Sequence, residues 1–192
     1  MRKKTLVFFV MFFVAFGFVA AAFAGDPPKD ERKHTKLGKY VNSAEAYEMW
    51  KAKPDGVYIV DCRTPEEYVF VGHAPMAHNI PSMLWTGKWD AEKKQFSMAK
   101  NENFEAYAKK KFKPEQTIMV MCRSGHRSAA SVNRLAEAGF TNVYNIVDGF
   151  EGDMIKDEES YYDGKRMKNG WKNSGAPWTY SLDANLVYIP AE

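Results

Sequence analysis

The sequence predicts an α/β protein with a single domain, in which a mainly parallel sheet is flanked by helices. Short apolar runs rich in β-branched residues, such as residues 57–61 (VYIVD) and 118–121 (IMVM), are typical of strands buried on both faces. Capped segments with helical spacing alternate with these runs, which is the pattern of parallel strands joined by helical crossovers. With 192 residues, the chain is long enough for one domain with a sizeable core.

Residues 1–24 predict a secretory signal peptide. A basic start (MRKK) precedes an uncharged apolar run, and Ala22 and Ala24 have the spacing of a cleavage site, so we expect cleavage after Ala24. The mature protein would then be exported, to the periplasm in a bacterium, and would not stay attached to the membrane. The alternative is an uncleaved membrane anchor, since residues 6–24 are long enough to span a bilayer.

Charge and composition exclude several classes of ligand. Cleavage would remove Arg2, Lys3 and Lys4, which account for the whole net charge of +3, and would leave 24 basic and 24 acidic residues. With neither a net positive charge nor a basic patch interleaved with aromatics, no nucleic acid is expected as a partner. The four histidines and two cysteines lack ligand spacing, so we expect no metal, and nothing indicates a cofactor.

The chain divides into a leader, a linker, one domain and a tail. Residues 25–37 are polar, contain two prolines and predict a flexible linker. We place the domain at residues 38–180, with insertions at 83–97 and 151–170, and a C-terminal tail at 181–192.

Capping residues mark the first two helices. After a short strand, Asn42 or Ser43 caps a helix, and the strand 57–61 follows it. Thr64 can then cap a second helix, with Pro65 at its first position and Glu67 completing a capping box.

The second half of the domain continues the alternation of strands and helices. A short strand is expected at 78–80, a buried strand at 118–121 and a helix at 126–138, which Gly139 ends. A last strand lies within residues 142–150.

Cys122 stands between the strand 118–121 and a helix, where it could be a packed apolar residue, half of a disulfide or a nucleophile. Export makes a disulfide with Cys62 the default, since these are the two cysteines of the chain. The local sequence favours the nucleophile. A short loop that enters a helix turns backbone N–H groups inward and favours a thiolate, Gly125 permits the tight curvature, and Arg123 and Arg127 add positive charge.

Four motifs in order resemble the rhodanese (thiosulfate sulfurtransferase) family. They are VDCRTPEEY, GHAPMAHNIP, CRSGHRS and VYNIVDGF, and the resemblance covers roughly residues 38–150. The resemblance implies a single rhodanese domain with a five-stranded, mainly parallel sheet between helices. It also implies a sulfurtransferase, in which Cys122 takes the outer sulfur of thiosulfate or polysulfide, becomes a persulfide and passes the sulfur to cyanide, sulfite or a thiol.

The same resemblance assigns the site residues. The loop that would cradle a small anionic sulfur substrate is formed by Arg123, Ser124, Gly125, His126, Arg127 and Ser128. Arg127 would hold the charged end of the donor, His126 would modulate local charge, and Asp61 and Arg63 would brace the loop. Related cell-cycle phosphatases have one residue more between cysteine and arginine, so the six residues from Cys122 to Arg127 favour sulfur over phosphate.

Two departures from the family pattern leave alternatives open. Cys62 stands where the family usually has valine, either as a core residue or as a resolving thiol close to Cys122. Residues 83–97, with Trp85, Trp89 and Phe96, either fold over the active-site crevice or form a self-packed surface excursion. A carrier that delivers persulfide sulfur to a partner protein with little turnover remains the alternative function. A redox dithiol is weakened by the absence of a Cys-x-x-Cys motif.

Overall fold

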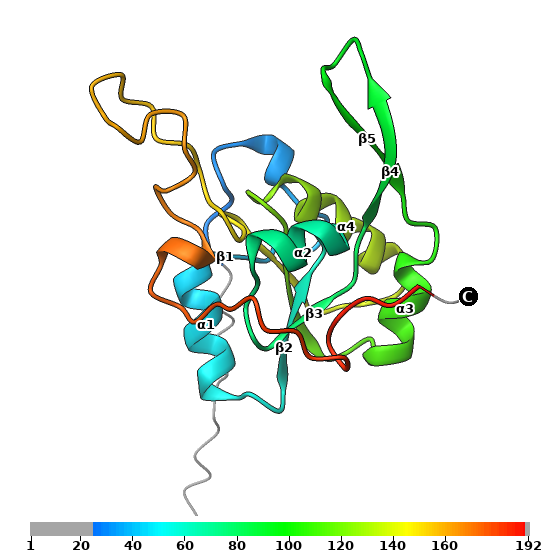
Figure 1. Cartoon of the computed structure of the whole chain (residues 1–192). Helices are drawn as coiled ribbons and strands as arrows, with labels where there is room; N and C mark the ends of the chain where they lie inside the picture. Colours follow the sequence, from blue (N-terminus) through cyan, green and yellow to red (C-terminus); the bar gives the residue numbers. More distant parts are fainter. Residues whose placement is uncertain (1–24, 191–192) are drawn as a thin grey trace, which may run out of the picture.

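The computed structural model describes residues 25–190, and the predicted leader at residues 1–24 lies outside them. The predicted α/β fold is confirmed: five parallel strands form one sheet in the order β1-β7-β6-β2-β3, with helices on both faces (Figure 1). The sheet strands are β1 (Tyr40–Val41), β2 (Val57–Asp61), β3 (Ala77–Asn79), β6 (Thr117–Met121) and β7 (Val143–Ile146). The helices are α1 (Ser43–Ala52), α2 (Pro65–Val71), α3 (Phe104–Lys111) and α4 (His126–Glu137), with short 3-10 turns η1 (Glu31–Lys33) and η2 (Trp171–Asn173).

Capping places the starts of α1 and α2 as the sequence predicts. Asn42, rather than Ser43, caps α1, and its capping box closes through Glu45. Thr64 caps α2 and forms the predicted capping box with Glu67. Helix α4 ends at Glu137, just before Gly139, whose backbone has a φ of 99°.

Two hydrophobic clusters fill the space on either side of the sheet. Alternate residues of a strand point to opposite faces, so Ile59 packs on the side of α1 and Val60 on the side of α3 and α4. Cys62 and Cys122 both belong to the second cluster, and their side chains are 0% and 1% exposed. The two cysteines therefore share one face of the sheet, at the carboxyl ends of neighbouring strands.

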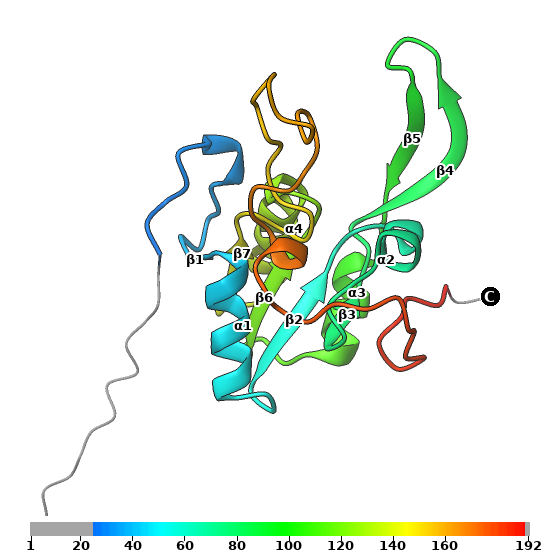
Figure 2. The same ribbon diagram turned by 60° about the vertical axis from the view of Figure 1, so that its left-hand side comes forward.

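The insertion at residues 83–97 contributes to an antiparallel hairpin of β4 (Met83–Asp90) and β5 (Gln95–Lys100), which rises from the body of the domain (Figures 1 and 2). Its aromatic side chains pack on one another, with the rings of Trp85 and Trp89 edge-on to Phe96 at 5.1 and 5.4 Å. Figure 2 shows that residues 151–170 rise from the same end of the sheet, on the other side of α4. The two insertions thus flank the carboxyl ends of the strands.

The N-terminal segment differs from the predicted flexible linker. Residues 25–37 contain η1, and the buried Lys33 side chain packs beside α4. The Asn145 side chain donates to the Lys33 carbonyl at 3.0 Å, and Gly25 N–H donates to the Tyr40 carbonyl at 3.0 Å. The polar composition concealed this role, because the segment is held by hydrogen bonds and ion pairs rather than by an apolar face.

The predicted C-terminal tail also contacts the domain. The Leu186 carbonyl accepts a hydrogen bond from Asn79 N–H at 2.8 Å, at the end of β3, and Tyr188 packs against Tyr107 of α3. Within residues 25–190, no helix is long and apolar enough to cross a membrane.

Candidate active site

Cys122 follows the last residue of β6 and faces the N-terminus of α4. Its Sγ accepts a hydrogen bond from Gly125 N–H at 3.2 Å and lies 3.5 Å from Ser128 Oγ. The first N–H groups of a helix have no partner within the helix, so they direct positive charge toward this sulfur. The loop between β6 and α4 is therefore built to hold a negative charge on Cys122.

The sharp turn at Gly125 can be made only by a residue without a side chain. Its φ is 97°, and a Cβ atom there would lie 2.1 Å from the Val147 carbonyl oxygen. Gly149 is restricted in the same way, since a Cβ atom would lie 2.5 Å from the Cys122 carbonyl oxygen. Phe150 N–H donates to that carbonyl at 2.7 Å. The turn after β7 thus packs directly against the back of the cysteine loop.

The surroundings of Cys122 favour the thiolate. Burial alone would oppose ionisation, but the neighbouring Cys62 thiol, the charge of Arg127 and the hydrogen bonds from Ser128 together hold the pKa of Cys122 well below its ordinary value. Burial and the adjacent Cys122 charge raise the pKa of Cys62, which therefore stays a neutral thiol. These opposite shifts favour a negative charge on Cys122 and a neutral thiol at Cys62.

The strand register places the two cysteines next to each other. Asp61 of β2 pairs with Met121 of β6, and Cys62 N–H extends the ladder by donating to the Met121 carbonyl at 2.8 Å. Neighbouring strands lie about 4.8 Å apart, which is well inside the limit of about 7 Å between Cα atoms for a disulfide. The two cysteines are not joined by a disulfide in this structure, and a resolving role for Cys62 stays a prediction.

Arg127, expected to hold the charged end of the donor, makes a bidentate ion pair with Glu67 of α2. The nitrogens Nη1 and Nη2 lie 2.7 and 2.6 Å from the two carboxylate oxygens. Burial opposes ionisation of Glu67, but the Arg127 charge lowers the pKa of Glu67 overall. Only a capping role was predicted for Glu67, because a contact between side chains 60 positions apart leaves no local signal in the sequence.

The other loop residues point in different directions. His126 Nε2 lies 2.7 Å from Asp30 Oδ2, which ties the start of α4 to the N-terminal segment. Hydrogen bonds from Arg32 and then from His126 hold the pKa of Asp30 well below its usual range. Arg123 is exposed, whereas Ser124 is buried. The loop's cationic side chains are thus spread around it rather than gathered over the sulfur.

Asn145 is a site residue that the sequence analysis missed. Its side chain in β7 accepts from Ser128 Oγ at 2.7 Å and donates to the carbonyls of Gly125 and Lys33 at 3.2 and 3.0 Å. A single buried amide therefore joins the cysteine loop to the N-terminal segment. A polar residue in the middle of the apolar strand VYNIV is the signal that could have revealed it.

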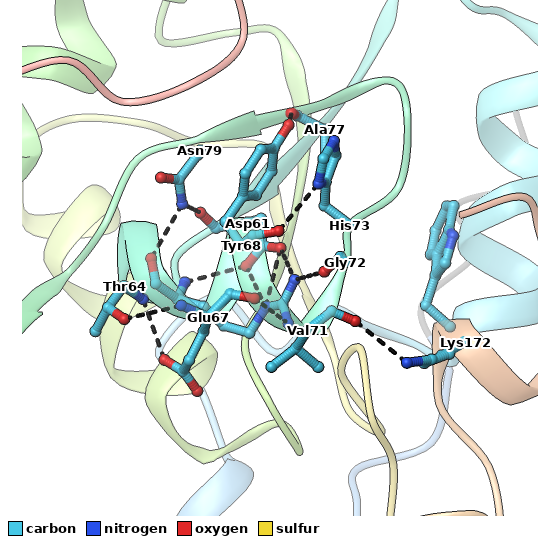
Figure 3. A network of polar contacts seen from close by, with 12 residues as sticks. Asp61, Thr64, Glu67, Tyr68, Val71, Gly72, His73, Ala77, Asn79 and Lys172 are labelled. Carbon is cyan, nitrogen blue, oxygen red and sulfur yellow. Dashed lines mark hydrogen bonds and ion pairs between the residues drawn. The ribbon is translucent and has the colours of Figure 1, made fainter. Parts of the chain in front are cut away.

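Asp61 and Arg63 form a fully buried ion pair behind the site. Figure 3 shows Asp61 among the polar contacts that surround it, with Asn79 and Gly72 close by. The Arg63 guanidinium donates to both Asp61 oxygens and to the Gly72 carbonyl at 2.7 Å, and it lies 4.1 Å from the centre of the Phe150 ring. Phe150 also donates its N–H to the Cys122 carbonyl, so the pair supports the cysteine loop through this ring.

One face of the hairpin forms a wall of a groove beside the loop. The groove has a volume of about 600 Å³ and is lined by Phe70 of α2, Trp85, Phe96, Met98 and Arg123. Met98 Sδ lies 4.0 Å from Arg127 Nη1. The base of the hairpin therefore borders the site, while its tip points away from the domain (Figure 2). The hairpin combines the two alternatives of the sequence analysis, since it is self-packed and its base also narrows the approach to the loop.

Among the described residues, no group of three or more His, Cys, Asp or Glu side chains is arranged to hold a metal ion. The chemistry available at the site is that of a buried thiolate at a helix N-terminus.

Comparisons with known proteins agree with this architecture. Residues 43–154 match the Rhodanese-like domain family. An uncharacterized protein of Rickettsia conorii is 31% identical over 140 residues, which are 72% of this chain and 94% of that protein. Thiosulfate sulfurtransferase 16 of Arabidopsis thaliana is 37% identical over 91 residues, which are 47% of this chain and 68% of that protein.

Solved structures show the same fold. The crystal structure of Rv0390 from M. tuberculosis superposes with a TM-score of 0.58 at 28% identity, covering 73% of this chain and 96% of that one. The match of the whole domain, in sequence and in structure, establishes the family. The chain belongs to the rhodanese-like domain family.

Proposed function

We propose that the protein is a sulfurtransferase that moves sulfane sulfur from thiosulfate or polysulfide to a thiophilic acceptor, with Cys122 as the carrier. The observation that carries the proposal is the position of the Cys122 sulfur at the N-terminus of α4, where it accepts a hydrogen bond from the Gly125 amide at 3.2 Å. This setting lowers the pKa of Cys122 and favours the thiolate. The similarity to a plant thiosulfate sulfurtransferase supports the same class of reaction.

The proposed reaction has two displacements at sulfur. The Cys122 thiolate attacks the outer sulfur of thiosulfate, a new S–S bond forms, and sulfite leaves with the electron pair of the broken bond. An acceptor thiolate then attacks the outer sulfur of the Cys122 persulfide, and Cys122 leaves as the thiolate. The N–H groups around the loop favour negative charge on the sulfur in both steps, so no general base is needed for Cys122.

Mass spectrometry tests the proposal directly. After incubation with thiosulfate or polysulfide, the peptide that contains Cys122 should gain the mass of one sulfur, and the Cys122→Ser protein should gain none. Steady-state transfer to cyanide should be lost in the same variant. If neither donor adds sulfur to Cys122, the proposal is wrong.

The Arg127–Glu67 ion pair supports a second candidate, a persulfide carrier with little turnover of its own. The arginine expected to bind the donor anion is already neutralised by a carboxylate at 2.6 Å, which weakens its attraction for thiosulfate. A carrier would accept one sulfur in a single turnover but would show negligible steady-state turnover with small acceptors. A sulfur-accepting protein would then be its partner. For either candidate we propose a periplasmic setting after cleavage behind Ala24.

A further inference from the structure

A cavity of about 660 Å³ lies beside the cysteine loop, on the side away from the hairpin. Ser124 and His126 of the loop form part of its wall, and the remaining wall comes from the N-terminal segment and from residues 151–170. These segments lie next to each other above the sheet in both views (Figures 1 and 2). The cavity is thus built by segments that the sequence analysis treated as a linker and an insertion.

Side chains of positive charge dominate this cavity. Arg32 is paired with Asp30 at 2.7 Å, and Lys33 lies 3.6 Å from Asp153. Three further cations in the wall, Lys156, Arg166 and Lys168, have no acidic side chain within ion-pair distance among residues 25–190.

This surplus of positive charge is local. The chain from residue 25 onward carries equal numbers of basic and acidic residues, so three unpaired cations in one cavity are not a consequence of overall composition. Like charges repel when they are held together, and an anionic ligand relieves that repulsion. The arrangement therefore fits a ligand with more than one negative group.

The size of the cavity favours an organic anion over an inorganic one. Cavities of roughly 300 to 1,000 Å³ hold organic ligands of drug size, whereas thiosulfate would leave most of this space unfilled. The wall also includes Met154 and Ile155, which offer apolar contact to a carbon skeleton.

The cavity lies directly against the loop that holds Cys122. Gly125 donates its N–H to the Cys122 sulfur. The same residue packs against the Lys33 side chain, since a Cβ atom added to Gly125 would lie 3.1 Å from Lys33 Cδ. His126 is fixed at the rim by Asp30. A ligand seated here lies against the loop that carries the reactive sulfur.

We propose that this cavity binds the carboxylates of a small peptide-like thiol, or its persulfide, as the organic partner in sulfur transfer. The inference rests on the proposed function, because it names the class of acceptor or donor for Cys122. In the acceptor direction, the bound thiolate attacks the outer sulfur of the Cys122 persulfide, forms an organic persulfide and releases the Cys122 thiolate. The reverse reaction loads Cys122 from the organic persulfide.

The first experiment measures binding without chemistry. S-methylglutathione carries two carboxylates and no thiol, and its binding is followed by calorimetry. We expect the Lys156→Glu/Lys168→Glu protein to bind it about tenfold more weakly than the wild type, because two attractive charges at exposed positions become repulsive. Lys88→Glu/Lys109→Glu makes the same change in net charge at exposed positions outside the cavity and should bind like the wild type. Lys156→Arg/Lys168→Arg should retain binding, because the charge is kept.

The second experiment measures transfer from the Cys122 persulfide to glutathione and to uncharged 2-mercaptoethanol. The preference for glutathione, as a ratio of kcat/KM values, should fall about tenfold in Lys156→Glu/Lys168→Glu but not in the Lys88→Glu/Lys109→Glu control. A normal Cys122 persulfide with equal glutathione preference in both variants would overturn the cavity assignment alone. Lysine-dependent binding of S-methylglutathione without any persulfide on Cys122 would overturn the proposed function and leave the cavity assignment standing. Displacement of S-methylglutathione by thiosulfate at lower concentration than by glutathione would show an inorganic site and refute the organic class.

Discussion

Replacing Cys62 by valine removes the thiol beside Cys122 and keeps a small apolar side chain in the same core position. A hydrogen bond to a charged group contributes about 1.5 to 3 kcal/mol, and about 1.4 kcal/mol corresponds to one pKa unit. Because the neighbouring Cys62 thiol favours the thiolate form, its removal should raise the pKa of Cys122. The remaining effects of Arg127 and Ser128 should keep that pKa below the value for a thiol buried alone.

The ultraviolet absorbance of the thiolate, followed against pH, measures this pKa. The rate of persulfide formation with thiosulfate should follow the same curve, since the thiolate is the attacking form. At a pH between the two inflections, the valine variant should therefore react about tenfold or more slowly than the wild type.

Stability gives an independent readout of the same change. The pKa of Cys122 is lower in the folded protein than in the unfolded chain, so the thiolate stabilises the folded state. This stabilisation is complete above the unfolded-state pKa of about 8.5 and is lost as the pH falls to the folded-state pKa. In Cys62→Val, the loss should begin at the same unfolded-state pKa but end at higher pH, and its total size should be smaller. Urea unfolding at a series of pH values locates it.

Cys62→Ser is the matched control, because a hydroxyl can still donate to the Cys122 thiolate. It should keep a pKa for Cys122 close to that of the wild type. If the valine variant has the wild-type pKa, the cysteine pair does not set the charge on Cys122. If serine raises the pKa as much as valine does, packing rather than hydrogen bonding is responsible, and the reasoning fails.

Three further predictions concern the support of the site, the acid stability of the fold and the groove beside the hairpin. Arg63→Met leaves the Asp61 carboxylate buried without a partner, so it should lower the free energy of unfolding, measured by urea titration, by about 3 to 5 kcal/mol. Arg32→Met, at an exposed ion pair, should change the free energy of unfolding little. Equal effects of the two substitutions would refute the bracing role of Arg63. Burial, with a smaller contribution from Lys111, lowers the pKa of His78 to about 4. Between about pH 6.5 and 4, the unfolded state therefore binds a proton at His78 that the folded state does not bind. The free energy of unfolding should decline as the pH falls through this range. His78→Gln should flatten this decline and exposed His34→Gln should not, and an unchanged slope in His78→Gln would contradict the assignment. Trp85→Ala removes part of the groove wall and should raise the KM of apolar thiol acceptors. The Trp89 side chain packs on the same Phe96 ring but lies outside the groove, so Trp89→Ala should leave this KM unchanged. Equal KM values in the two variants would show that the hairpin does not shape access to the site.

The fold could be predicted because its determinants are local. The capping residues Asn42 and Thr64 act within a few positions of themselves, and the apolar strand 118–121 indicates burial on both faces without reference to other segments. The rule that parallel strands end on one edge then brought Cys62 and Cys122 to the same place.

The polar contacts of the site could not be predicted because they join distant parts of the chain. Glu67 reaches Arg127 across 60 positions, and Asn145 reaches the Lys33 carbonyl across 112. Neither contact leaves a periodic pattern in the sequence. The packing of residues 25–37 was missed for the same reason, since a segment held by ion pairs and carbonyl contacts has the composition of a linker.

The ion pairs of the cysteine loop imply that the residues that support the reactive sulfur differ from those that select the substrate. The polar side chains of the loop are already engaged, Arg127 by Glu67 and His126 by Asp30, so they stabilise the loop more than they attract a free anion. An anionic substrate must find its countercharge elsewhere. Lys156 and Lys168, which have no ion-pair partner among residues 25–190, offer it on one side of α4. In the apolar groove beside the hairpin, the exposed Arg123 is the one cation of the lining among the residues that the structure describes. If Cys122 carries sulfur as proposed, changes in either insertion should alter the preference among thiol acceptors and leave formation of the Cys122 persulfide intact.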